Sequence, residues 1–455
     1  MRYLLSVLCC GLALLAACLL LSEVSKAPFT PESHGKRQVD QQKPIRHPAT
    51  AEPKLDDRMG GAPRRGSHLA ASPLLAMQMG ARRKFSPPIR VHVGSSDRSK
   101  LRIAIDGPYK IRPVGSTRLL QEGARLGPAT VAVTPIGFRI ANVHYRVSRL
   151  ELVALTSPSI WVNDHQYRGT LRLFRLPEGG ALAVNVVALE DYLASVVDSE
   201  MPAAFPICAR RAQAIVARTF AIFQMEHRKT HPYFDVYSST RSQRYLGYQY
   251  RNAAGSRLAG ESESARQTSR DTAGIVCTFR GQLFCTYYSA VCGGHTTPGK
   301  QVFADAVGPL QSVPCQWCQP ARFYRWTTRL SLEEATKHLA PLIRSNEKGF
   351  GKLVSLSATA RKPTAHPKLF KMSDGKYEIF ATATQLQRQL PLEKLHSPRF
   401  TAAVDGDDLV LHGRGHGHGV GMCQWGARGL ALAGKSALEI VRYYYPGVQL
   451  VIVSP

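Results

Sequence analysis

Two amphipathic runs near the middle of the chain predict a pair of helices with a polar break between them. Apolar side chains recur at helical spacing across 189–197 and again across 212–220. Pro202 and Pro206 lie between the two runs, and a proline disfavours helical geometry in the residue that precedes it. We therefore expect the first helix to end near Glu200, which leaves this carboxylate at an exposed junction between helix and loop.

The chain on either side of this helix pair predicts strands and one further helical segment. Between residues 89 and 189, short segments alternate apolar with polar residues and are separated by Gly, Pro or Asn, which is typical of strands. The interval 274–297 predicts a strand, a turn at Arg280-Gly281 and a second strand that ends in a glycine loop. Helical periodicity resumes at Trp425 and continues to about Tyr444.

The N-terminus carries an apolar segment that predicts export. Arg2 precedes an almost unbroken apolar run from Tyr3 to Leu21, so residues 1–27 are expected to be a signal peptide or a membrane anchor. The tetrapeptide that ends at Cys18 resembles a bacterial lipobox, which adds a lipoprotein to the alternatives. All three place the body of the protein outside the cytoplasm, in the bacterial cell envelope, whether periplasmic, membrane-anchored or secreted.

The charge balance favours a polyanionic partner. The chain has 59 Lys and Arg against 32 Asp and Glu, a formal net charge of +27, which suits nucleic acid, anionic lipid or an acidic cell-wall polymer. The export segment argues against nucleic acid. Residues 28–84 are rich in Pro, Gly, Arg and His and predict a disordered basic tether, either a spacer or an electrostatic attachment. With 455 residues, we expect one large unit with an inserted subdomain, or two domains.

Several short segments occur in the order of the motifs of one protein family. They are Leu189–Leu193, Ser199–Pro202, Ala217–Phe220, Tyr287–Thr296 and His418–Gly426. Together they resemble the SpoIID/LytB family, which is named for a sporulation protein and an amidase enhancer. The resemblance covers residues 85–455 and implies an α+β fold, in which a SpoIID-like core domain carries a β-rich inserted subdomain near 110–185, with a glycan-binding cleft between them.

The resemblance also implies an activity and a set of site residues. The activity is that of a peptidoglycan lytic transglycosylase, which cleaves MurNAc-GlcNAc glycan strands to 1,6-anhydroMurNAc ends in cell-wall remodelling or division. Glu200 is the implied catalytic residue, and the mechanism requires no cofactor. The candidates for substrate binding lie on the matched segments and are Gln213, Arg218, Tyr288, Ser289, His418 and Gln424.

The residues around Glu200 fit a reaction that uses a single acid. Glycoside hydrolysis usually needs two carboxylates, and the nearest one, Asp198, is two residues away and points to a different side of the helix. In lytic cleavage the 6-hydroxyl of the sugar replaces water, so one carboxyl group can protonate the glycosidic oxygen and then accept the hydroxyl proton. This role requires a raised pKa, which burial beside Met201, Tyr192 and Phe205 would supply.

Alternatives remain for one residue and for the function as a whole. Arg218 is expected to bind the muramic lactyl carboxylate, to orient Glu200, or to form a structural ion pair. The chain is alternatively a non-catalytic glycan-binding protein that stimulates a cell-wall amidase. A third possibility is a basic, membrane-anchored scaffold of a division or remodelling complex.

Seven cysteines follow the export segment, and two arrangements compete for them. Outside the cytoplasm disulfides are allowed, and Cys277 and Cys285 flank the predicted hairpin turn. We favour a thiol bridge or another structural role for the cysteines, with a structural zinc as the alternative. The residues with the spacing of such a zinc site are Cys292, His295, Cys315 and Cys318.

Two further segments are not expected to bind metal. In sporulation members of the family, cysteine and histidine residues in the segment after the second helix resemble a zinc site. Here Tyr237, Arg241 and Ser242 occupy the corresponding positions, and none is a zinc ligand. The three histidines of the C-terminal glycine loop have no evident ligand set apart from Cys423. This cysteine replaces the usual serine of the family motif.

Overall fold

The structure is a computed structural model of the chain, which divides into two units, Met1–Gln78 and Met79–Pro455. The predicted export segment and basic tether lie outside the residues that it describes. None of the described helices combines the length and the apolar character needed to cross a membrane. The described residues, all in the second unit, are 88–94, 101–227, 232–347, 349–359 and 369–453.

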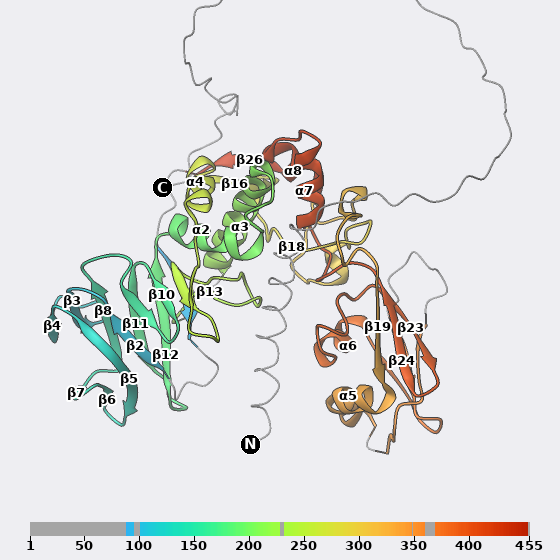
Figure 1. Cartoon of the computed structure of the whole chain (residues 1–455), viewed down its shortest axis with the longest axis horizontal. Coiled ribbons are helices and arrows are strands. Elements are labelled where there is room, and N and C mark those ends of the chain that lie inside the picture. Colours follow the sequence, from blue (N-terminus) through green and yellow to red (C-terminus); the bar gives the residue numbers. More distant parts are fainter. Residues whose placement is uncertain (1–87, 95–100, 228–231, 348, 360–368, 454–455) are drawn as a thin grey trace, which may run out of the picture. The chain divides into compact units, whose positions relative to one another are not determined.

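The segment from Ile89 to Val187 folds into strands, as its alternating pattern predicts, and two large sheets result (Figure 1). The seven-stranded sheet has the order β13-β1-β12-β11-β8-β3-β4, and the eight-stranded sheet has the order β15-β14-β10-β9-β2-β5-β6-β7. The strands before the helix pair are β1 (Ile89–Val93), β2 (Arg102–Ile105), β3 (Tyr109–Pro113), β4 (Gln121–Gly123), β5 (Leu126–Thr134), β6 (Gly137–Ile140), β7 (Val143–Tyr145), β8 (Arg149–Ala154), β9 (Ile160–Val162), β10 (His165–Tyr167), β11 (Thr170–Arg175) and β12 (Ala181–Val187).

Strands from beyond the helix pair complete both sheets. β13 (Val236–Tyr237) pairs in parallel with β1, whereas β14 (Gln249–Arg251) and β15 (Arg257–Ala259) extend the second sheet antiparallel from β10. The β-rich region therefore draws on residues on both sides of the predicted 110–185.

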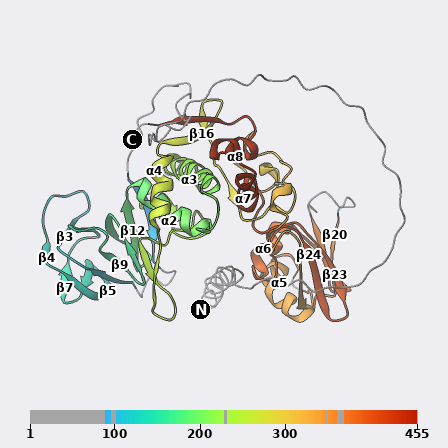
Figure 2. The same ribbon diagram turned by 45° about the horizontal axis from the view of Figure 1, so that its top comes forward.

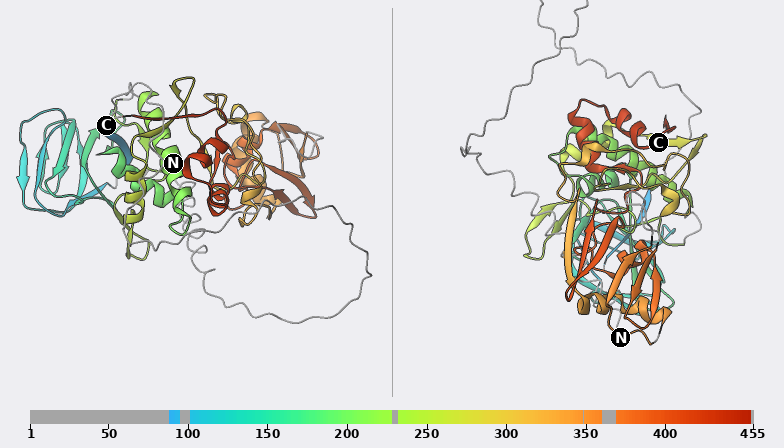
Figure 3. Two further views of the ribbon diagram at one scale, coloured as in Figure 1. Left: turned by 90° about the horizontal axis from the view of Figure 1, so that it is seen from above. Right: turned by 90° about the vertical axis from the view of Figure 1, so that its right-hand side faces the viewer.

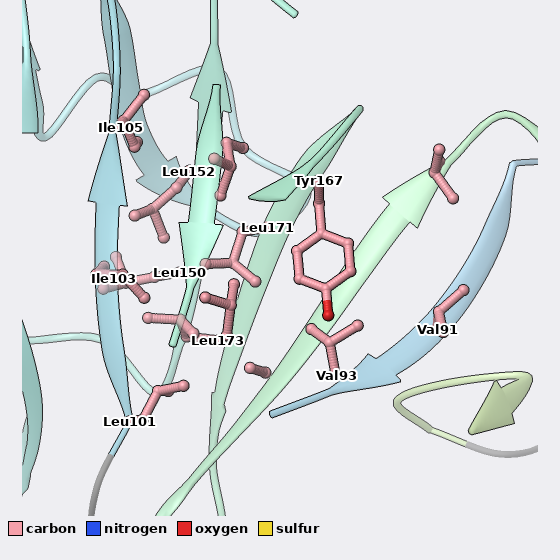
Figure 4. Close-up of a cluster of buried hydrophobic side chains, with 14 of the residues drawn as sticks. Val91, Val93, Leu101, Ile103, Ile105, Leu150, Leu152, Tyr167, Leu171 and Leu173 are labelled. Atoms are coloured by element: carbon pink, nitrogen blue, oxygen red, sulfur yellow. The ribbon is translucent and has the colours of Figure 1, made fainter. Parts of the chain in front are cut away.

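A shared apolar core joins the two sheets. Figure 4 shows side chains of β1, β8 and β11, from the first sheet, packed against side chains of β2 and against Tyr167 of β10, from the second. The burial along β1 alternates residue by residue, because successive side chains of a strand point to opposite faces. The alternation read from the sequence thus corresponds to one core-facing side of each sheet.

The two predicted helices are α2 (Leu189–Glu200) and α3 (Ile207–His227), and they are separated by the expected break. Met201 has extended geometry (φ −137°, ψ 123°), as the residue before Pro202 should. α3 contacts α2, α4 (Glu263–Asp271), α7 (Gln424–Leu432) and α8 (Ala437–Tyr444) (Figure 2). The predicted helix 425–444 is therefore two helices, because Gly434 has a positive φ and Ser436 caps α8.

Two small sheets place later segments against this helical layer. β16 (Ile275–Phe279) and β17 (Gln282–Leu283) form the predicted strand, turn and strand, and β26 (Gln449–Ile452) pairs with β16. β18 (Tyr288–Ser289) and β25 (Met422–Cys423) run in parallel, with Tyr288 opposite Met422 and Ser289 opposite Cys423. A Cβ at Gly421 would lie 1.9 Å from the Tyr287 carbonyl oxygen, so glycine is required for this approach.

A region that the sequence patterns did not predict occupies residues 326–413. It has its own apolar core, formed by two three-stranded sheets, with the orders β19-β24-β23 and β20-β21-β22, and two helices (Figure 3). Its elements are β19 (Trp326–Ser331), α5 (Leu332–Asn346), β20 (Ser355–Ala358), β21 (Phe370–Ser373), β22 (Glu378–Ala381), α6 (Ala383–Gln389), β23 (Phe400–Asp405) and β24 (Asp408–Gly413). The described residues together have an α+β fold.

Candidate functional site

Glu200 is the last residue of α2, and the break at Met201 fixes its position. The backbone N–H of Arg244 donates a hydrogen bond of 2.8 Å to Glu200 Oε1. Met201 and Phe205 are buried beneath the junction, and the Glu200 side chain keeps partial access to solvent. Glu200 as a residue is therefore partly exposed, whereas its carboxyl group is desolvated by its surroundings.

The surroundings of Glu200 favour its protonated form. Desolvation raises the pKa of the carboxyl group, and this effect outweighs the opposing effects of Arg244, through its N–H and its charge, and of the hydrogen bonds from Gln424 and Tyr288. The direction agrees with the sequence-based expectation. A carboxyl group in this state can donate a proton at a pH where an ordinary glutamate is ionised.

Neutral hydrogen-bonding groups connect the side chains around Glu200. The Tyr192 hydroxyl donates to Gln243 Oε1 (3.0 Å), and Gln243 Nε2 donates to the Tyr288 hydroxyl (3.1 Å). Gln424 Nε2 donates to Gln213 Oε1 (3.3 Å). The β18–β25 pairing brings Tyr288 and Gln424 together, since one belongs to β18 and the other follows β25.

Two further predicted site residues lie close to these groups in the fold. Ser289 follows Tyr288 on β18, and its hydroxyl is buried without a hydrogen-bond partner, as is Nε2 of Gln213. His418 Nδ1 accepts the Val420 N–H (3.1 Å), and burial lowers the pKa of His418 to about 4. His418 is thus neutral near pH 7. The structure brings Gln213, Tyr288 and Gln424 to Glu200.

Arg218 forms an ion pair with Glu190 instead of with Glu200. Its side chain is fully buried and donates from Nε and Nη2 to the two carboxylate oxygens of Glu190, at 2.8 and 2.7 Å. The same guanidinium donates to the carbonyl oxygens of Ser269 (3.1 Å) and Ile275 (3.2 Å). This placement corresponds to the structural alternative, and contact with a sugar is not supported, because no part of the side chain is exposed.

The acidic residues nearest to Glu200 along α2 are held elsewhere. Asp198 forms an ion pair with Arg210 and accepts the backbone N–H of Ser262. Glu190 is held by Arg218 at the other end of the helix. Neither Asp198 nor Glu190 is therefore a carboxylate partner of Glu200, and the remaining acid of the helix, Asp191, interacts with Arg168 and Glu261.

Comparisons with known proteins agree with the order of the motifs. The family model described as "Stage II sporulation protein" (SpoIID) matches residues 177–279, and one described as a domain of unknown function (DUF8618) matches residues 316–421. The chain is 31% identical to an uncharacterized protein of Brachyspira hyodysenteriae over 77% of this chain and 89% of that protein.

Relatives with informative names are more distant. The chain is 27% identical to stage II sporulation protein D of Bacillus subtilis, over 59% of this chain and 76% of the relative. It is 25% identical to the amidase enhancer of the same organism, over 57% of this chain and 40% of the relative. The chain belongs to the SpoIID/LytB family.

The SpoIID match and the candidate site overlap only in part. Residues 177–279 contain Glu200, Gln213 and Gln243, whereas Tyr288 and Gln424 lie beyond the match. The second match, to the domain of unknown function, contains the whole of the separately packed region 326–413. The site of this SpoIID/LytB protein is therefore completed by segments distant from the matched stretch.

An aromatic group next to the site was missed in the sequence. The rings of Phe205 and Trp425 stand edge to face, with centroids 5.4 Å apart. The guanidinium of Arg428 lies 5.3 Å from the Trp425 ring centroid and 5.7 Å from that of Phe205. Trp425 and Arg428 are three residues apart on α7 and so share a face of the helix. This spacing was the sequence signal from which the aromatic group could have been predicted.

The cysteines of this SpoIID/LytB protein depart from the predicted pairing. Cys277 and Cys285 are free, so the predicted disulfide is wrong. The register of the β16–β17 hairpin pairs Thr278 with Leu283. When continued by one residue, it sets Cys277 opposite Phe284, and Cys285 then points to the other face.

The structure also differs at one residue from the four zinc ligands predicted as the alternative. The thiols of Cys292, Cys315, Cys318 and Cys423 are buried, and their sulfur atoms all lie within 4.8 Å of one another. His295 is exposed, and its backbone carbonyl accepts a hydrogen bond from Arg399. Cys423, which comes from the C-terminal glycine loop, therefore takes the place predicted for His295.

Proposed function

We propose that this SpoIID/LytB protein is a peptidoglycan lytic transglycosylase with Glu200 as its acid and base. The observation that carries the proposal is the environment of Glu200, which is partly accessible, has a raised pKa and contacts neutral donors instead of a cation's side chain. The similarity to stage II sporulation protein D supports the assignment to the cell wall.

The proposed reaction uses one carboxyl group twice. Protonated Glu200 gives its proton to the glycosidic oxygen as the bond from C1 of the muramic residue to that oxygen breaks. The resulting carboxylate then accepts the proton of the 6-hydroxyl of the same sugar as O6 bonds to C1. The products are a 1,6-anhydromuramic end and a new free hydroxyl on the leaving strand, and the carboxyl group is protonated again.

The groups around Glu200 have roles that follow from their positions. The N–H of Arg244 and the side chains of Tyr288 and Gln424 orient the carboxylate that forms after proton donation. The hydroxyl of Ser289 and Nε2 of Gln213 are buried and have no hydrogen-bond partner among the described residues, so we assign them a place behind the site and no contact with the sugar. The predicted export segment places this activity in the cell envelope.

Stimulation of a wall amidase is the second candidate function. It is favoured by the 25% identity with the amidase enhancer of Bacillus subtilis. In that case the same site would bind a glycan strand without cleaving it, and the partner enzyme would be a cell-wall amidase. Glycan binding would then be independent of proton transfer by Glu200.

The deciding experiment is mass spectrometry of purified glycan strands, with and without peptide stems, after incubation with the full chain. We expect new ends that are one water lighter than hydrolytic products, and a rate about 10²–10⁴-fold lower in Glu200→Gln. Glu122→Gln, the same change at an exposed position on β4, is the matched control and should cleave normally.

Either of two outcomes would reject the enzyme assignment. One is cleavage by Glu200→Gln at the parental rate. The other is strand binding by both proteins with no new ends, which would support the amidase-stimulating function.

A further inference from the structure

Four cysteines from three separate segments meet at one point in the fold. Cys292 follows β18, Cys315 precedes the short helix η4 (Gln316–Cys318), Cys318 ends that helix, and Cys423 ends β25. Each side chain is at most 1% exposed. Cys292 and Cys423 are 131 residues apart in the chain, so the tertiary fold alone brings these thiols together.

The sulfur positions suit a metal better than disulfides. The Sγ atoms of Cys292 and Cys318 are 3.6 Å apart, far beyond the roughly 2.05 Å of a disulfide bond. Four sulfurs at about 2.3 Å from a central zinc stand at the corners of a tetrahedron with edges of about 3.8 Å. All six separations fall within 4.8 Å, so the four sulfurs surround one centre and do not divide into two bonded pairs.

We propose that Cys292, Cys315, Cys318 and Cys423 bind one Zn²⁺ ion as a closed tetrathiolate site. Four protein ligands leave no open position, which is typical of a structural zinc and unlike a catalytic one. Thiolates select zinc over Mg²⁺ or Ca²⁺, which prefer oxygen ligands.

The groups around the cluster are suited to its negative charge. Zinc with four thiolates carries a net charge of −2, and the site supplies donors to the sulfurs. The backbone N–H groups of Cys292 and Gly426 both donate to Cys423 Sγ at 3.3 Å. The Tyr444 hydroxyl lies 3.1 Å from Cys315 Sγ. Such outer contacts orient the ligands of a metal and tune its binding.

A half-buried cation lies beside the cluster. Arg399 Nη1 donates to the carbonyl oxygens of Cys292 and His295, both at 2.8 Å. The guanidinium thus holds the loop that carries Cys292 and places a positive charge beside the thiolates. At Gly426 a Cβ would lie 2.6 Å from Cys315 Sγ, so the cluster and the first turn of α7 require a glycine there.

The metal would fasten the two strands that complete the Glu200 site. Ser289 lies opposite Cys423 in the β18–β25 pair, and Tyr288 lies opposite Met422. Gln424 directly follows Cys423. A zinc bound to Cys292 and Cys423 therefore holds Tyr288 and Gln424 in place from behind, without touching substrate. Zinc binding itself does not depend on the proposed enzymatic function.

The first test measures the unaltered protein. The full chain, purified without added metal, is examined by inductively coupled plasma mass spectrometry and by mapping of thiols with N-ethylmaleimide. We expect one zinc per chain, with the four cysteines protected from the reagent until a chelator is added under denaturing conditions. Disulfide-linked peptides among the four, an absence of metal, or iron in place of zinc would each overturn the proposal.

The second test removes one ligand by a mild change. In Cys423→Ser the hydroxyl can still accept the Gly426 N–H, because serine is a favoured residue at the start of a helix, so the fold should persist. We expect zinc affinity to fall by at least about tenfold, as judged by retention during dialysis against a chelator. Cys208→Ser changes a free thiol of α3 outside the cluster and should keep its zinc.

Circular dichroism of both variants decides whether the fold is intact. Retention of zinc by folded Cys423→Ser at the parental level would contradict the proposed ligand set. If Cys423→Ser fails to fold, the metal content and thiol mapping of the unaltered chain still decide the question.

Discussion

The two ends of α2 hold glutamates in opposite surroundings. Glu190, in the first turn, is neutralised by the buried guanidinium of Arg218 and also accepts the Ser269 hydroxyl. Glu200, at the last position, accepts the backbone N–H of Arg244 and otherwise meets neutral groups. The helix dipole reinforces the difference, because it stabilises a negative charge at the N-terminus and disfavours one at the C-terminus.

This difference separates a structural carboxylate from one suited to proton transfer. A glutamate paired with a buried arginine stays ionised and has no proton to give near neutral pH. A desolvated glutamate without a cationic side chain in contact retains its proton more readily, at a cost to stability when it does ionise. Helix position and partner therefore favour Glu200 over Glu190 as the proposed acid.

The largest expected effect on this contrast comes from removing the structural carboxylate. Glu190→Ala leaves the Arg218 guanidinium, 1% exposed, without its counter-charge. We expect the free energy of unfolding to fall by about 3 kcal/mol. Chemical denaturation followed by circular dichroism measures the change.

A second glutamate–arginine pair provides the control for this measurement. Glu263→Ala removes the partner of Arg266 and Arg270 on α4, where the glutamate side chain is 68% exposed, and should lower stability much less than Glu190→Ala. Equal losses in the two variants would show that the Glu190–Arg218 pair is not an important structural contact.

The contrast is sharpened by the pH dependence of glycan cleavage. The proposed acid must be protonated to act, and its pKa is raised. Activity should therefore persist above pH 4.5, the ordinary pKa of glutamate. Beyond the raised pKa it should decline about tenfold per pH unit. Gln424→Ala removes a hydrogen bond that favours the ionised form. We therefore expect the descending limb of kcat/KM to move to higher pH.

The direction of that movement is the decisive observation. A limb that moves to lower pH, or one that is absent, would show that the protonation state of Glu200 does not govern the rate. The profile of Glu122→Gln, measured in parallel, should match that of the unaltered protein.

Local rules accounted for the parts of this site that depend on neighbouring residues. The end of α2 at Glu200 followed from Pro202, and the strands before it followed from alternation. The partner of Arg218 could not be found in this way, because Glu190 lies 28 residues earlier and their contact depends on the packing of α2 against α3.

Long-range pairing explains what the sequence failed to predict elsewhere. The inclusion of Cys423 in the thiol cluster depends on the parallel β18–β25 pair, which no local pattern specifies. The region 326–413 was not predicted; its strands are four to six residues long, and the pairing of β19 with β24 joins segments far apart in the chain. The disulfide prediction was wrong because the hairpin register sets Cys277 opposite Phe284, one residue before Cys285.

The smallest expected effect concerns the loss of folding stability when the desolvated Glu200 carboxyl group ionises. Its pKa in the folded protein lies above the ordinary value of 4.5, so the folded state binds more protons than the unfolded state between these two values. Stability therefore falls as pH rises through this window and stays reduced above it. Glutamine is neutral throughout, so Glu200→Gln should match the parent in stability at pH 4 and exceed it at pH 8. Denaturation at the two pH values, with Glu122→Gln as the matched control, measures this difference.

A gain that is the same at both pH values would indicate improved packing instead of a desolvated charge, and the contrast between the two ends of α2 would then rest on Glu190 alone.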